Sequence, residues 1–138
     1  MKKTVFSLLL VISAFSSFSQ DVSGTWVWDS DNDENSLELI LSTESKLDLL
    51  GSYCAVFQKG NKVDCNDSTE APNIYLRQSG PNTFEGTFRS SFSNTSGQLK
   101  LISLDSDKLQ LEVISEPSGE YYLPKSVFLE RVSKIDRE

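Results

Sequence analysis

The sequence predicts an all-β protein, most simply a single antiparallel up-and-down barrel of eight or nine strands. Between residues 22 and 132 the apolar residues recur mostly at every second position, in short runs separated by Gly, Asn, Asp, Ser or Pro. This is the pattern of half-buried strands joined by turns, and no segment of the region has a sustained helical period. Closure into a barrel removes exposed strand edges. A two-sheet sandwich is the alternative.

Each apolar run predicts one strand. In the sixth run, Phe84, Phe88 and Phe92 are expected on one side of the strand. Their spacing would also suit a helix, but Gly86 and the Thr and Ser residues favour a strand. In chain order we expect strands at residues 22–28, 37–41, 47–57, 62–65, 74–76, 84–92, 99–101, 109–113 and 121–132.

Residues 1–19 have the pattern of a cleaved export signal. Lys2 and Lys3 precede an apolar segment at residues 5–15, and Ser17 and Ser19 provide the small residues for cleavage after Ser19. The apolar segment is shorter than the roughly 20 residues that cross a bilayer. We therefore expect one mature domain, residues 20–138, that is secreted or periplasmic and has no membrane anchor.

The composition excludes several chemistries. The chain has 138 residues, 20 Asp and Glu against 13 Lys and Arg, no His and two Cys. The absence of His excludes Ser-His-Asp and Cys-His nucleophiles and His-ligated metals. The net charge of −7 argues against nucleic acid as a partner, because phosphate contacts need clustered Lys and Arg.

Cys54 and Cys65 are expected to form a disulfide, because an exported protein meets an oxidising compartment. The residues between them favour a hairpin in which Phe57 and Lys62 close a loop of four residues. In that register the two cysteines lie directly opposite each other on a non-hydrogen-bonded pair, where Cβ atoms are closest. We interpret the pair as a structural staple, since it is neither C-x-x-C nor accompanied by other metal ligands.

The motif Gly24-Thr25-Trp26 in the first predicted strand resembles the G-x-W start of the calycins, the superfamily of lipocalins and avidins. In those barrels the Trp closes one end, and a basic residue of the last strand lies across its ring. The resemblance gives these structural roles to Trp26 and Arg131. A guanidinium over an indole face adds about 0.5–2 kcal/mol.

Leu50-Gly51-Ser52-Tyr53 resembles the avidin strand whose Tyr contacts biotin. This chain has Trp28 where avidins have an Asn for the same biotin oxygen, and it has only two Trp in all, so no biotin site is implied. The chain also looks like small uncharacterised secreted bacterial domains that open with G-x-W-x-W. The predicted ligand-lining residues of the barrel are Trp28, Tyr53, Phe84 and Phe88, although core packing is the commoner fate of such aromatics.

An acidic segment at residues 29–35 has acids at alternate positions, like the start of a calcium loop. The expected Gly is replaced by Glu34, and Ile40 stands where a Glu ligand would be. We therefore expect a solvated acidic loop, no metal and no cofactor.

Three classes of function remain. The first expectation is a lipocalin-like binding protein that takes a small apolar or amphipathic ligand in the barrel. The alternative is an inhibitor or immunity-type protein whose acidic surface binds an exported basic partner. An enzyme comes last, because no nucleophile or base is evidently positioned, and we expect no catalysis. The oligomeric state is not indicated.

Overall fold

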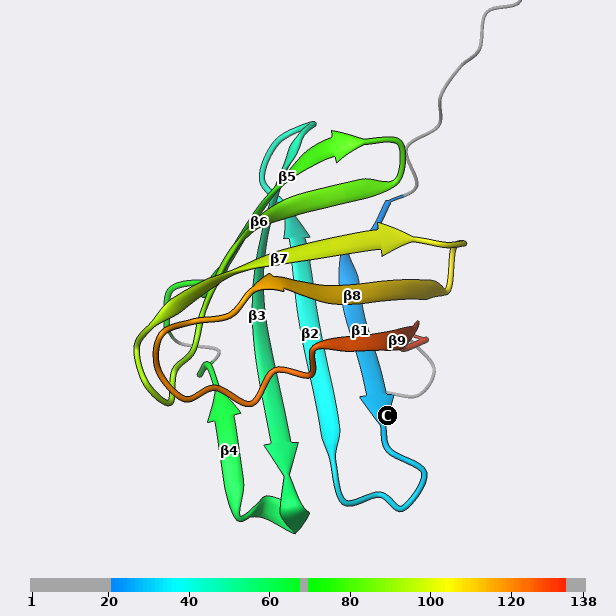
Figure 1. Ribbon diagram of the computed structural model, residues 1–138. Coiled ribbons are helices and arrows are strands. Elements are labelled where there is room, and N and C mark those ends of the chain that lie inside the picture. The colour runs from blue at the N-terminus through cyan, green and yellow to red at the C-terminus, as the bar shows by residue number, and fades with distance from the viewer. Residues whose placement is uncertain (1–20, 68–69, 134–138) are drawn as a thin grey trace, which may run out of the picture.

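The computed structural model describes residues 21–67 and 70–133, and these form an antiparallel barrel (Figure 1). The predicted export signal lies outside the described residues. Nine strands are present among them: β1 (Gly24–Asp29), β2 (Ser36–Thr43), β3 (Asp48–Phe57), β4 (Lys62–Cys65), β5 (Ile74–Gly80), β6 (Thr83–Arg89), β7 (Ser96–Ser103), β8 (Lys108–Ser115) and β9 (Ser126–Arg131).

Eight of these strands close the barrel, which confirms the predicted fold class. The hydrogen-bonded order is β2-β1-β9-β8-β7-β6-β5-β3-β4, and pairing of β2 with β3 completes the circle. Every neighbouring pair is antiparallel. The barrel has two ends. The "Trp26 end" carries residues 21–23 and the connections 44–47, 81–82 and 104–107, and the "Asp64 end" carries the connections 30–35, 58–61, 90–95 and 116–125.

Along one of its edges, β3 pairs with two different strands. Residues Asp48 to Gly51 of β3 pair with β5, whereas Cys54 to Phe57 pair with β4. Among the described residues β4 has no second strand partner, and Figure 1 shows its outer edge without a neighbouring strand. At the Asp64 end, backbone pairing therefore stops at β4, and other bonds must join β4 to the rest of the barrel.

Two predicted strands stop or start three or more residues inside their predicted bounds. The strand predicted at 84–92 ends at Arg89, and the one predicted at 121–132 begins at Ser126. Phe92 is therefore not on the face of Phe84 and Phe88 but lies in a turn, with 52 % of its surface exposed. The reason in both cases is that backbone N–H groups, those of Phe92 and Tyr122, bond to the side chain of Asp64 instead of to a neighbouring strand.

The inside of the barrel is filled with side chains. Six leucines at its centre have no accessible surface, and an open cavity beside them would leave part of that surface accessible to water. These are Leu39, Leu99, Leu101, Leu109, Leu111 and Leu129. They belong to one continuous cluster with Trp26, Tyr53, Phe84 and Phe88.

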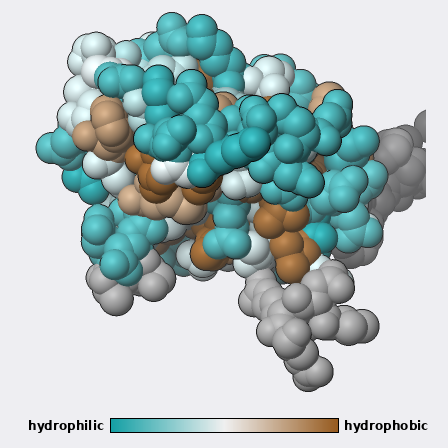
Figure 2. Space-filling model, turned by 90° about the horizontal axis from the view of Figure 1, so that it is seen from below, coloured by the Kyte–Doolittle hydropathy of each residue, from teal (hydrophilic) through white to brown (hydrophobic). Residues whose placement is uncertain are grey.

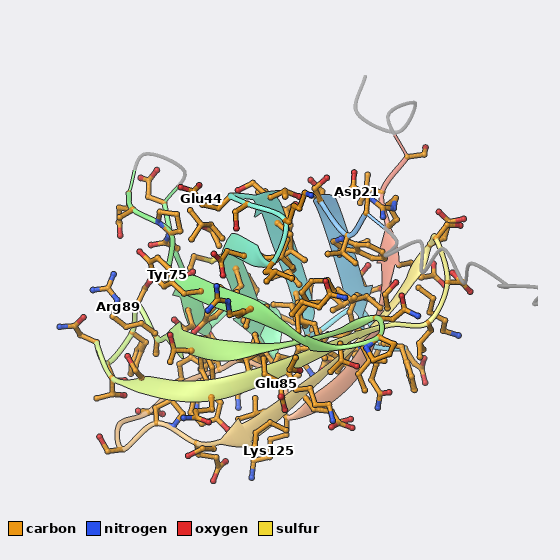
Figure 3. All side chains as sticks on the ribbon, turned by 90° about the horizontal axis from the view of Figure 1, so that it is seen from above. Asp21, Glu44, Tyr75, Glu85, Arg89 and Lys125 are labelled. Carbon is orange, nitrogen blue, oxygen red and sulfur yellow. A yellow bond between two sulfur atoms is a disulfide. The ribbon has the colours of Figure 1, made fainter. Side chains whose placement is uncertain are left out.

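The outer surface is polar, as alternation along the strands requires. Seen from above, Tyr75, Arg89 and Lys125 lie around the outside of the barrel (Figure 3). Gly86 of β6 faces Leu76 of β5, and a Cβ atom at Gly86 would come within 1.9 Å of the carbonyl oxygen of Tyr75. This close approach explains why the position carries no side chain. No helix among the described residues is long and apolar enough to cross a membrane.

Candidate functional site

Arg131 closes the Trp26 end of the barrel. Its guanidinium carbon lies 4.4 Å from the centre of the Trp26 ring, and its nitrogens donate to the backbone carbonyls of Asp21, Ser23 and Ser106. Trp26 is fully buried and donates from Nε1 to the carbonyl of Val22, 2.9 Å away. One cation thus ties the amino-terminal segment and the β7–β8 connection to the barrel.

Gly24 of the G-x-W motif is required by this arrangement. Its φ is +125°, a backbone conformation that residues with a side chain rarely adopt. A Cβ atom there would also lie 3.1 Å from a guanidinium nitrogen of Arg131. The motif therefore combines a special backbone angle with the room that Arg131 needs to reach the Trp26 ring.

The Asp64 end is organised by a buried carboxylate. Asp64, in β4, has no exposed surface, and its neighbours in sequence point outward or half outward. Five groups donate hydrogen bonds to it: Ser91 N (2.9 Å) and Phe92 N (3.2 Å) to Oδ1, and the Tyr53 hydroxyl (2.8 Å), the Ser90 hydroxyl (2.9 Å) and Tyr122 N (3.2 Å) to Oδ2. These bonds join β4 to the β6–β7 and β8–β9 connections where strand pairing is absent.

Tyr53 remains protonated in this network. Its burial, and next the nearby charge of Asp64, raise the pKa of the Tyr53 hydroxyl far above its ordinary value. The hydroxyl is thus held as a hydrogen-bond donor to Asp64. Because both oxygens of Asp64 are already occupied by donors and out of contact with solvent, the cluster has the properties of a structural anchor and not of an exposed acid or base.

The Cys54–Cys65 disulfide is formed and lies beside this anchor. The predicted register is confirmed, with Cys54 opposite Cys65, Ala55 opposite Asp64 and Phe57 opposite Lys62. The short helical turn Gln58–Gly60 occupies the predicted loop. The disulfide fixes β4 against β3 and therefore fixes the position of Asp64.

Four aromatic side chains cross the Asp64 end in successive contact. Ring centres are 6.4 Å apart for Trp28 and Phe57, 6.5 Å for Phe57 and Tyr122, and 5.0 Å for Tyr122 and Phe92. We call these residues the aromatic patch. Phe92 is exposed and the other three are half-buried. Seen from below, apolar residues interrupt the otherwise hydrophilic surface of this end (Figure 2).

Charged groups surround the aromatic patch. Lys62 lies 5.3 Å from the centre of the Tyr122 ring and 4.0 Å from a carboxylate oxygen of Glu120. The hydroxyl of Tyr122 donates to Glu120, and this bond is the main cause that raises the pKa of Tyr122 to about 12. Burial, followed by a hydrogen bond to Glu116, raises the pKa of Tyr121 to about 12.

The acidic loop at residues 29–35 borders the aromatic patch on the Trp28 side. Its exposed carboxylates, Asp29, Asp31 and Asp33, form no ion pair with another described residue. They do not gather into a metal site either, since no group of three or more metal-ligating side chains occurs among the described residues. The loop is held by hydrogen bonds to the β3–β4 turn, from Lys59 N to the Glu34 carbonyl and from Gln58 N to Asn35 Oδ1.

The predicted ligand-lining residues lie in two different environments. Tyr53, Phe84 and Phe88 belong to the filled core, whereas Trp28 belongs to the partly exposed aromatic patch. Tyr53 and Phe88 are in contact, with ring centres 6.2 Å apart, but neither contacts Trp28 in a ring pair. Trp28 packs against the core cluster that contains the other three, but from the partly exposed side, and a ligand role for the four remains a prediction.

Sequence analysis missed Asp64, Phe92 and Tyr122 as members of one site. Asp64 is a single acid in a chain with 20 Asp and Glu. One signal was present: in the predicted register Asp64 lies opposite Ala55, on the face that points into the barrel, so an inward carboxylate could have been inferred. Its donors are 11 to 58 residues away in sequence, and no local pattern relates them to it.

Comparison of the chain with protein-family models, with curated proteins and with solved structures finds no match.

Proposed function

We propose that this protein is an exported binding protein that recognises a positively charged protein partner through the aromatic patch. The observation that carries the proposal is a partly exposed row of four aromatic side chains above a filled barrel. A filled interior leaves the surface as the place for recognition. Aromatic residues are enriched at the energetic centres of protein interfaces, and contiguous apolar residues on a polar surface mark interaction sites.

The charge of the partner follows from the surroundings of the patch. Asp29, Asp31 and Asp33 are exposed and form no ion pair within residues 21–67 and 70–133, and the chain carries a net charge of −7. Removal of the two lysines of the predicted signal makes the mature domain more negative still. Such a surface accelerates the approach of a basic protein and repels an acidic one.

Export agrees with the rest of the proposal. The disulfide is suited to an oxidising compartment outside the cytoplasm, and residues 1–19 carry the predicted export signal. The antiparallel barrel that opens with Gly24-Thr25-Trp26 is consistent with the calycin resemblance. We assign the chain, within this proposal, to the small secreted domains that begin with G-x-W-x-W.

The experiment uses two fluorescein-labelled peptides of equal length, one that alternates Arg with Leu and one that alternates Glu with Leu. We call them the arginine probe and the glutamate probe. Fluorescence anisotropy measures the affinity of the oxidised domain for each. We expect the arginine probe to bind, the glutamate probe not to bind, and the association rate of the arginine probe to fall as salt is added.

The location of binding is tested with a matched pair of variants. Phe92 and Phe128 are both exposed, at 52 % and 53 %, but Phe128 lies on the outer wall in β9. We expect Phe92→Ala to weaken the arginine probe about tenfold, which corresponds to about 1.4 kcal/mol, and Phe128→Ala to leave it within about twofold. No loss in either variant would mean diffuse charge attraction, and equal losses in both would mean binding that is not centred on the aromatic patch; either result would contradict the proposal.

A native mass spectrum of the exported protein tests the alternative, in which a small molecule binds inside the barrel. If the protein keeps an added small-molecule mass, a ligand inside the barrel is favoured, which was the first expectation of the sequence. That outcome would overturn recognition by the surface alone, because the filled interior would have to open.

A further inference from the structure

We infer that Asp64 is the positioning residue of the aromatic patch, holding two of its four members in place for the partner. This inference rests on the proposed function. Asp64 does not belong to the patch itself, because it is completely buried. It acts through the backbone of Phe92 and Tyr122, whose N–H groups donate to its carboxylate at 3.2 Å each.

A carboxylate is an energetically unfavourable group to bury at the end of a barrel. Burial of an ionised group is unfavourable unless hydrogen bonds compensate for the lost water, and no cation lies among the five donors to Asp64. An apolar side chain would fill the same space without that cost. What an apolar side chain lacks is the ability to fix the two connections in one definite arrangement, and we take this ability as the reason for Asp64.

The backbone N–H groups of the two connections donate to different oxygens of Asp64. Oδ1 accepts from Ser91 N and Phe92 N of the β6–β7 connection, and Oδ2 accepts from Tyr122 N of the β8–β9 connection. The hydroxyls of Tyr53 and Ser90 also donate to Oδ2. The separation of these oxygens is fixed by covalent geometry, so the two connections are held in register. The edge-to-face contact of Phe92 with Tyr122, with ring centres 5.0 Å apart, follows from that register. A surface ordered in advance loses less entropy on binding.

Replacement of Asp64 by Asn is expected to affect the β6–β7 and β8–β9 connections differently. The hydroxyls of Tyr53 and Ser90 can each reverse and accept a hydrogen bond from an amide NH₂ group, but a backbone N–H cannot. Placing the NH₂ group at the Oδ2 position opposes one backbone donor, Tyr122, whereas placing it at the Oδ1 position opposes two, Ser91 and Phe92. Asp64→Asn is therefore expected to release Tyr122 and to keep the β6–β7 connection bonded.

The experiment measures amide hydrogen exchange by NMR and binding of the arginine probe in Asp64→Asn. We expect exchange at Tyr122 to rise at least tenfold relative to Phe92, and the affinity for the arginine probe to fall about tenfold. The control is Val22→Ala, which removes buried apolar atoms at the Trp26 end. We expect that control to keep the exchange ratio of Tyr122 to Phe92 and to bind the probe within about twofold.

Ser90→Ala provides a milder test that keeps the carboxylate. It removes the hydroxyl that donates to Oδ2 and that also accepts from Phe92 N at 3.2 Å. Phe92 N keeps its bond to Asp64 Oδ1 in this variant, so we expect exchange at Phe92 and at Tyr122 to stay within about threefold of their original rates. If Asp64→Asn fails to fold, this variant decides the inference: release of Phe92 with the carboxylate in place would assign its position to Ser90 and overturn the role of Asp64.

The outcomes separate this inference from the proposed function. If the original protein binds the arginine probe and Asp64→Asn binds it equally well despite faster exchange at Tyr122, the positioning role is wrong and the proposed function stands. If the original protein binds neither probe, the proposed function itself is wrong. If Val22→Ala loses as much affinity as Asp64→Asn, the effect is one of general stability and the positioning role is again wrong.

Discussion

The two ends of the barrel are closed by side chains of opposite charge. At the Trp26 end the guanidinium of Arg131 donates to three backbone carbonyls, and at the Asp64 end the carboxylate of Asp64 accepts from three backbone N–H groups. Each side chain ties irregular connections to the regular wall of the barrel. Each also contacts an aromatic residue, the Trp26 ring in one case and the Tyr53 hydroxyl in the other.

The two closures differ in their access to water. Arg131 is half-buried and its carbonyl partners lie near the surface, whereas Asp64 is completely buried. Carbonyl groups that lose Arg131 can bond to water, whereas the donors to Asp64 converge on a side chain that has no exposed surface. The comparison teaches that the same number of backbone bonds has a larger energetic weight where solvent cannot replace the missing partner.

Among the substitutions that test this comparison, Asp64→Ala is expected to reduce the stability of the fold most. Its five donors would lose an acceptor that is completely buried, and we expect a loss of about 4 kcal/mol in the free energy of unfolding. Urea titration followed by far-ultraviolet circular dichroism measures this loss. Tyr53→Phe, which removes a single donor, is the control and should cost about 1 kcal/mol. A loss below that of Tyr53→Phe would contradict the view of Asp64 as an anchor.

A smaller effect is expected from Arg131→Ala at the opposite end. The variant loses the contact with the Trp26 ring and three hydrogen bonds, but water can reach the carbonyls, so we expect about 2 kcal/mol. Thermal unfolding with and without the arginine probe measures both properties. We expect reduced stability and unchanged affinity for the probe. Weaker binding with unchanged stability would assign Arg131 to recognition and overturn its structural role.

The smallest effect concerns the tyrosines of the Asp64 end at alkaline pH. In the folded chain Tyr121 and Tyr122 have pKa values of about 12, against an ordinary value of 10.0. A raised pKa means that the folded state binds protons more tightly, so the stabilisation is complete below pH 10 and is lost as the pH rises through 12. Ultraviolet absorbance of tyrosinate should therefore show two groups titrating near pH 12.

Glu120→Gln distinguishes the titration of Tyr122 from that of Tyr121. Removal of the charge that accepts from the Tyr122 hydroxyl should lower the pKa of Tyr122 and leave that of Tyr121, which depends on its burial and on Glu116. Tyr53 should ionise only when the chain unfolds, since its burial and the charge of Asp64 oppose ionisation. Ionisation of Tyr53 in the folded chain would mean that the Asp64 end opens more readily than the structure indicates.

Sequence analysis predicted those features that depend on local pattern. Alternation of apolar residues predicted the strands, and the register of the Cys54–Cys65 hairpin followed from its length and loop. The contact between Trp26 and Arg131 followed from a motif at the first strand and a basic residue in the last. The predicted position of Phe92 was wrong because the alternating pattern continues past Arg89, where the strand itself ends.

The sequence by itself therefore determined the all-β class, the closed barrel and its disulfide, because alternation, turn residues and hairpin register are properties of neighbouring residues. Only the tertiary structure decided that the interior is filled and that Asp64 gathers donors from three distant segments. The physical reason is that filling and hydrogen bonding are properties of the closed barrel. A carboxylate acquires its partners only when β4 is brought against two connections that follow it much later in the chain.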